Sequence, residues 1–135
     1  MAATITKALK DFIAGKMAWV ATADKNGIPN LAPKGSLQVV DDHTLAFADL
    51  FSVKTRAALE QNRNIAVAVI ETKKPEGYQF KGDAELLSSG PLYDQVKANL
   101  EKMAPGLPPP KYVVKIAVQE IYSLTPGPEA GKKLA

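Results

Sequence analysis

Residues 65–71 read IAVAVIE, and this alternation of branched and small apolar side chains constrains the fold more than any other stretch. A strand formed here would be apolar on both faces, so both faces need a cover. Residues 112–118, YVVKIAV, are also apolar on both faces. One face of each strand can fill the inside of a small closed or nearly closed barrel. The other face then requires a helix or a second copy of the chain.

Turn residues divide the rest of the chain into further short strands. Asp24-Lys25-Asn26-Gly27 predicts a hairpin turn, and Pro29 and Pro33 place parts of the following strand at an edge or a bulge. Consecutive strands joined by tight turns favour an antiparallel sheet. The predicted strands are 17–23, the interrupted return strand from Ile28, 36–40, 45–49, 65–71, 78–88 and 112–124.

Three helices are expected around these strands. A stripe of Ile5, Leu9, Phe12 and Ile13 predicts a helix over 4–15 with Thr4 as its cap. A second helix is expected at about 53–63 after Ser52, and a third begins at Pro91 with its buried stripe at Leu92, Val96, Leu100 and Met103. With 135 residues the chain is predicted to form one domain, 1–135, with an ordered-to-frayed tail from about 125.

The composition excludes several classes of function. The chain has no cysteine, so disulfides and thiolate chemistry are absent. Its N-terminus lacks the apolar core of a signal peptide, and no run is long enough to span a bilayer. The net charge of +3 comes from dispersed Lys and Arg, which does not favour nucleic acid as a partner. We therefore expect a cytoplasmic protein with neither nucleic-acid nor membrane partners.

Few residues of the sequence suggest acid–base or metal chemistry. The single His43 follows Asp41 and Asp42 and precedes a Thr. This group could be a proton shuttle or metal ligand, but the same residue types favour a hairpin turn, which is the preferred interpretation. Asp83 and Glu85 share one face of a predicted strand, where a solvated face is more common than an acid–base pair. No catalytic side chain is assigned, and no metal site is predicted.

The strongest functional signal is a group of anion-binding residues between 33 and 56. Lys34-Gly35-Ser36 offers an approachable backbone and two donors. Lys54 and Arg56 lie in the first turns of the second predicted helix, where the helix dipole already places positive charge. Free helix amides, hydroxyl groups and cations together indicate a phosphate site. The alternative is that these cations are ordinary exposed residues.

The stretch that contains these residues reads GIPNLAPKGSLQVVDDHTLAFADLFSVKTRAALEQNRNIAVAVIE and is followed by GYQFKGDAEL. It resembles the FMN-binding split-barrel family. This is the pyridoxamine 5'-phosphate oxidase-like superfamily, and the resemblance to its short flavin-nucleotide-binding members covers about 17–122. It implies a mainly β fold with flanking helices: a six-stranded antiparallel Greek-key split barrel. It also implies a homodimer with FMN at the subunit interface.

The resemblance also assigns a cofactor site. Pro33, Lys34, Gly35, Ser36 and Leu37 would line the flavin ring and ribityl chain, Ala48 and Asp49 would lie on the neighbouring strand, and Ser52, Lys54 and Thr55 would hold the phosphate. Arg56 is a weaker match, and the strand around 78–80 would contribute from the second subunit.

Departures from the family pattern limit which activity is expected. Oxidases of the B6 vitamers carry an Arg near Pro33, a Lys near Gln38 and a longer C-terminal segment. Oxidation of pyridoxamine phosphate is therefore disfavoured. The leading expectation is an FMN-dependent oxidoreductase or electron-transfer protein served by NAD(P)H or an unknown redox partner. The alternatives are a non-enzymatic flavin store or sensor, a barrel for another anionic or tetrapyrrole ligand, and a ligand-free interaction protein.

Overall fold

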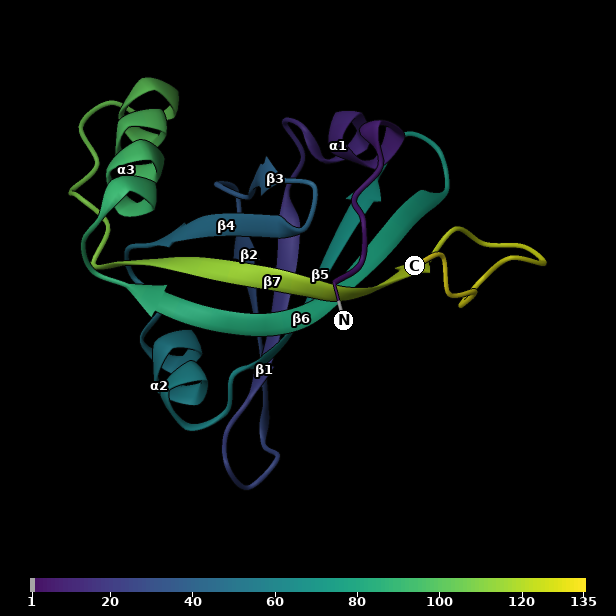
Figure 1. The fold of residues 1–135 in the computed structure, drawn as a ribbon, viewed down its shortest axis with the longest axis horizontal. Helices are drawn as coiled ribbons and strands as arrows, with labels where there is room; N and C mark the ends of the chain where they lie inside the picture. Colours follow the sequence, from purple (N-terminus) through teal and green to yellow (C-terminus); the bar gives the residue numbers. More distant parts are fainter. Residues whose placement is uncertain (1) are drawn as a thin grey trace.

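The computed structural model describes residues 2–135, which form a curled antiparallel sheet with three short helices (Figure 1). In chain order the elements are α1 (Lys7–Ile13), β1 (Ala18–Ala23), β2 (Pro29–Lys34), β3 (Gln38–Asp41), β4 (Thr44–Asp49), α2 (Val53–Gln61), β5 (Asn64–Glu71), β6 (Glu76–Leu87), α3 (Pro91–Met103) and β7 (Tyr112–Ser123). The strand order is β2-β1-β5-β6-β7-β4-β3. The expected mainly β, antiparallel architecture with flanking helices is thus confirmed.

The six strands implied by the family resemblance were wrong, because the sheet has seven strands. The chain from Pro29 to Asp41 is divided at residues 35–37, so β2 pairs with β1 while β3 pairs with β4. These two strands lie at opposite edges of the sheet order. A link of only three residues therefore joins the two edges, and the sheet has to curl to allow this connection.

The inside of the curled sheet is filled by alternate residues of the long strands. On β5, Ile65, Val67 and Val69 are buried, whereas the neighbouring Ala66 and Ala68 are only half-buried. The strand that is buried on both faces is β4. Its Leu45 and Phe47 face the main core, and Ala46 and Ala48 pack in a second cluster with α3 residues.

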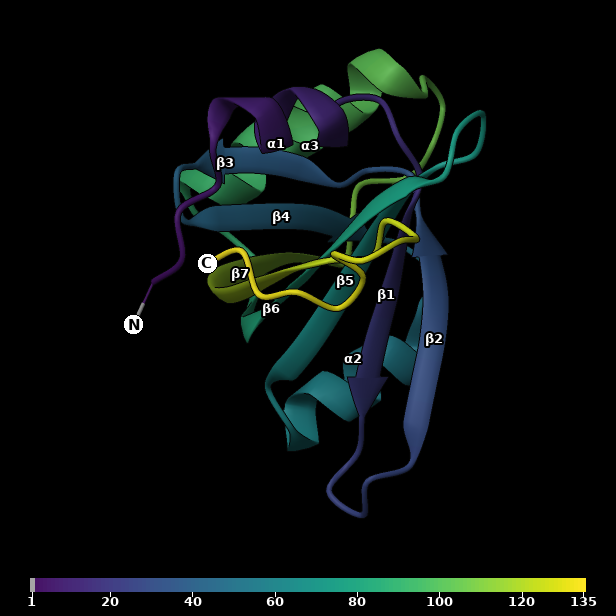
Figure 2. The same cartoon turned by 90° about the vertical axis from the view of Figure 1, so that its right-hand side faces the viewer.

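The helices lie at the two ends of the sheet. Figures 1 and 2 show α2 at one end, beside β1 and β2, and α1 and α3 toward the other end. The first helix begins later than expected, because Thr6 rather than Thr4 caps it by accepting the Leu9 amide at 3.3 Å. The tail after Leu124 is held along β7, with a bridge between Tyr122 and Lys133.

Candidate functional site

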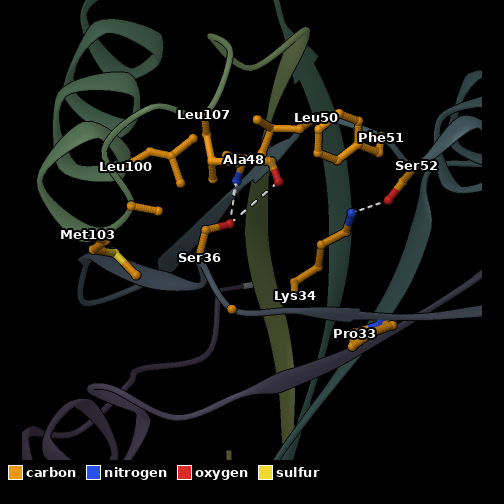
Figure 3. Close-up of a pocket in the computed structure, with 12 residues that line it drawn as sticks. Pro33, Lys34, Ser36, Ala48, Leu50, Phe51, Ser52, Leu100, Met103 and Leu107 are labelled. Atoms are coloured by element: carbon orange, nitrogen blue, oxygen red, sulfur yellow. Dashed lines mark hydrogen bonds between the residues drawn. The ribbon is translucent and has the colours of Figure 1, made fainter.

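A cavity of about 420 Å³ opens between the β2–β3 link, the end of β4 and the C-terminal half of α3 (Figure 3). Its volume lies within the range typical of small-molecule sites. One wall carries polar groups from the link and from the turn before α2, and the opposite wall is apolar. The lining residues are Pro33, Lys34, Gly35, Ser36, Ala48, Leu50, Phe51, Ser52, Leu100, Met103, Ala104 and Leu107.

A buried cation stands in the polar wall. The Lys34 ammonium donates to Ser52 Oγ, and its Nζ lies 3.7 Å from Asp49 Oδ1. The two charged side chains are only 9% and 4% exposed. Burial lowers the pKa of Lys34 below its usual value, and the nearby Asp49 carboxylate opposes that change. Asp49 Oδ1 also accepts the Ser52 amide at 3.0 Å, so it fixes the turn that leads into α2.

Ser36 ties the β2–β3 link to β4. Its Oγ accepts the Ala48 amide at 3.0 Å and lies 3.5 Å from the Ala48 carbonyl (Figure 3). This bond keeps the backbone at Gly35 against the cavity. The next residue, Leu37, is buried in the main core and does not line the cavity.

A second, smaller hollow of about 210 Å³ lies at the N-terminus of α2. Lys54 and Thr55 line it, and Ser52 and Phe51 line both hollows. The Thr55 hydroxyl is buried and accepts the Asn30 amide group at 3.0 Å. Ser52 stands at the N-cap position, but its side chain makes no capping bond and instead accepts from Lys34. The other lining residues are Asn30, Leu31, Ala32 and Val53.

The structure thus brings most of the predicted residues together, but divides them between two places. Six of them line the larger cavity: Pro33, Lys34, Gly35, Ser36, Ala48 and Ser52. Lys54 and Thr55 lie in the smaller hollow, where Ser52 connects the two sets. Asp49 lines neither of these hollows and lies behind Lys34 and Ser52.

Arg56 lies outside both hollows. Its guanidinium stands 5.5 Å from the centre of the Tyr112 ring, and its Nε is 3.7 Å from Glu60 Oε1. The two cations of the helix start therefore do not face one ligand.

The apolar wall from α3 was not expected from the sequence. Leu100 and Met103 were interpreted only as a buried stripe, yet Met103 is 63% exposed at the cavity rim. Asn30, which holds Thr55, was also missed, because its role depends on the pairing of distant segments.

The other titratable residues singled out in the sequence lie elsewhere. His43 stands in the turn between β3 and β4, where its Nδ1 is 3.0 Å from the Ala3 carbonyl oxygen. Within residues 2–135, no group of three or more His, Asp or Glu is placed to hold a metal ion. Over the same residues, no helix is long and apolar enough to cross a membrane.

The donor set fits a ligand with two chemically different ends. A helix N-terminus, a lysine and two hydroxyl groups suit a phosphate in the smaller hollow. The larger cavity has one buried cation and an apolar wall, which suits a planar ring with polar edges. An FMN molecule has both parts, joined by a polyol chain that could pass Ser52.

Comparisons with known proteins agree with this fold. The profile of the pyridoxamine 5'-phosphate oxidase family matches residues 5–125. An uncharacterised protein of Methanocaldococcus jannaschii is 33% identical over 134 residues, which span 97% of this chain and 88% of that protein.

Solved structures show the same similarity. The crystal structure of HupZ from Group A Streptococcus is 35% identical, covers 94% of this chain and 99% of its own, and superposes with a TM-score of 0.83. An FMN-binding protein from Syntrophomonas wolfei shares the fold at 20% identity, with a TM-score of 0.78 over 91% of this chain and 86% of its own. The chain therefore belongs to the pyridoxamine 5'-phosphate oxidase family.

Proposed function

We propose that this protein binds FMN and acts as a flavin-dependent oxidoreductase or electron-transfer protein. The observation that supports the proposal is the pair of adjoining hollows that share Ser52 and Phe51. The phosphate would lie at the N-terminus of α2 with Ser52, Lys54 and Thr55. The ring would lie in the larger cavity against the backbone of residues 33–36 and Ala48. When bound, FMN supplies the redox chemistry, and the protein supplies binding, orientation and electrostatics.

In this arrangement the two lysines have different tasks. Lys54 is exposed at the helix start, where its charge and the free amides favour a dianion. Lys34 is buried at the junction between the two hollows, where it meets the polyol or the ring edge. Its ammonium donates to Ser52 and lies beside the Asp49 carboxylate. An ammonium has three N–H groups, so a donor remains for a ligand.

A second copy of the chain is part of the proposal. Trp19 and Leu31 project from the outer face of β1 and β2. Phe51 lies in the turn between β4 and α2, and Val53 is the first residue of α2. All four are large apolar side chains with 43–73% of their surface exposed. Leu31, Phe51 and Val53 also line the smaller hollow, so a homodimer that covers them would close the phosphate site.

Titration of FMN and riboflavin into the purified protein tests the proposal. We expect FMN to bind with a Kd in the micromolar range or below, with its fluorescence quenched. Lys54→Met should weaken FMN binding at least about tenfold, and riboflavin binding much less, because only FMN carries the phosphate. Lys73→Met, in the exposed loop between β5 and β6, is the control. A protein that binds no FMN at micromolar concentration would overturn the proposal.

The alternative of a flavin store or sensor also has an observation in its favour. Lys34 is the only titratable side chain that lines the larger cavity in the part of the chain described. A store predicts FMN binding without reduction by NADH, NADPH or a redox partner, which anaerobic stopped-flow absorbance would show. A cytoplasmic location stays a prediction from the sequence.

A further inference from the structure

The wall of the larger cavity formed by α3 and the chain after it carries no charged side chain. Leu100 is buried, whereas Met103 and Leu107 are 63% and 43% exposed at the rim. Figure 3 shows Leu100, Met103 and Leu107 across the cavity from Lys34 and Ser52, and these three form an apolar lip. Ala104 and Leu50 add to the apolar lining. Among the residues that line the cavity, those from α3 and the chain after it offer only aliphatic and thioether groups.

Polar side chains of α3, β3 and the β2–β3 link are already hydrogen-bonded within the protein. Ser36 Oγ is engaged by the Ala48 backbone. Gln38 stands where the B6 oxidases carry a lysine, and its Oε1 accepts from Asn99 Nδ2 at 2.9 Å. The Tyr93 hydroxyl, on the first turn of α3, donates to the Pro110 carbonyl. None of these groups is a cation, so they do not form a binding site for a second phosphate.

Two lysines line the two hollows of the site, and neither lies on the α3 wall. Lys34 and Lys54 belong to the polar wall and the smaller hollow, where FMN is proposed to bind. A nicotinamide dinucleotide or a phosphorylated vitamer would need its own phosphate site, built from cations or a helix N-terminus. An uncharged ring needs only apolar surface to cover it.

Resting on the FMN binding proposed above, we infer that the reaction partner of the bound flavin is an uncharged planar acceptor of the quinone class, which enters over Met103 and Leu107. Bound FMN, once reduced by two electrons from a redox-partner protein or, in the test below, from dithionite, would be the reductant, and the quinone is the oxidant. Reduced FMN, as FMNH⁻, gives two electrons and the N5 proton to the quinone. The quinone takes a second proton from solvent and leaves as the hydroquinone, and the flavin returns to FMN.

A matched pair of acceptors tests the charge preference. FMN-loaded protein, reduced anaerobically with one equivalent of dithionite, is mixed in a stopped-flow instrument with menadione or with menadione sulfonate. Each rate is divided by the rate with free reduced FMN, which removes the intrinsic reactivity of the acceptor. We expect a preference of at least about tenfold for the neutral quinone, with saturation. An equal or reversed preference would overturn the inference.

Charge placed on the lip should change that preference. Met103→Lys and Leu107→Lys are each expected to shift the ratio toward the sulfonate by about tenfold. Leu134→Lys, an exposed apolar position that lines neither hollow of the site, is the control and should leave the ratio unchanged. If the wild type and the three variants show the same ratio of menadione to menadione sulfonate rates, entry along this wall is contradicted.

A binding measurement separates this inference from the proposed function. Menadione should stabilise the oxidised FMN-loaded protein against thermal unfolding more than its sulfonate does, with no electron transfer involved. If FMN does not bind, the proposed function and this inference both fail. If FMN binds normally and neither acceptor is preferred by rate or by thermal shift, only this inference fails.

Discussion

Replacing Asp49 with Asn removes the charge that faces Lys34 and nearly preserves the shape of the side chain. The pair is almost fully buried, with 3.7 Å between Lys34 Nζ and Asp49 Oδ1. Leaving one partner of such a pair unpaired costs about 3–5 kcal/mol. Lys34 can avoid part of this cost by losing its proton, because burial already lowers its pKa. We therefore expect Asp49→Asn to lower the free energy of unfolding by about 3 kcal/mol at pH 7.

A double-mutant cycle shows whether the loss belongs to the pair. Unfolding in urea is followed for Lys34→Met, for Asp49→Asn and for the double variant, at one protein concentration. The double variant should lose at least about 2 kcal/mol less than the sum of the single losses. The exposed pair Lys10–Asp42 is the control and should couple by less than about 1 kcal/mol. Single losses that add within about 0.5 kcal/mol would refute the coupling.

The pH dependence provides a second check. Because the pKa of Lys34 is lowered in the folded state, the unfolded chain holds more protons between that pKa and 10.5. The lysine therefore contributes a stability that rises with pH across this window. Asp49→Asn should lower the pKa further, so the gap between wild type and variant is largest near neutral pH and narrows toward pH 10. A constant gap from pH 7 to 10 would point instead to weakening of the Ser52 amide bond, whose acceptor would no longer be charged.

Three further substitutions test other parts of the structure. Gly82→Ala should cost at least about 3 kcal/mol, because the new Cβ would lie 2.1 Å from the Ala117 carbonyl oxygen. Gly35→Ala is the control for stability, because its new Cβ would lie 3.7 Å from the nearest atom, the Met17 terminal methyl group. Similar urea midpoints for Gly82→Ala and Gly35→Ala would contradict the steric argument. Tyr93→Phe should cost about 1 kcal/mol and speed proteolysis between 104 and 110, because the bond to Pro110 is lost. Leu31→Glu should shift the dimer toward monomer in sedimentation velocity, whereas Leu134→Glu, the control, should leave the fraction of dimer unchanged. A wild-type protein that is monomeric would contradict the proposed homodimer.

Local patterns in the sequence predicted the elements better than the way they meet. The strands around 65–71 and 112–124 and the helix starting at Pro91 follow from residue periodicity and turn residues, and the structure confirms them within a few positions. The count of six strands was wrong because it came from the family resemblance. The residues themselves, with Gly35 between two strand-forming runs, already indicated a division there.

In the candidate site, too, local spacing could be interpreted from the sequence, but contacts between distant segments could not. Lys54 and Arg56 are two positions apart on a helix of 3.6 residues per turn, so they point to nearly opposite sides. The sequence alone could therefore have excluded a shared ligand. It could not have shown that Lys34 reaches Ser52, because that contact depends on how β2 lies beside the turn before α2. The α3 wall depends likewise on long-range packing.

The pairing of β4 with β7 has a consequence for how the protein folds. Asp49 lies opposite Tyr112, and α2, β5, β6 and α3 intervene along the chain. Such non-local pairing is slow, because the entropy of closing the long loop is lost before the contacts form. The cavity needs both Ser36 against β4 and the segment after α3 that leads into β7. It therefore takes shape only late in folding, so a bound ligand should slow unfolding while leaving the refolding rate almost unchanged.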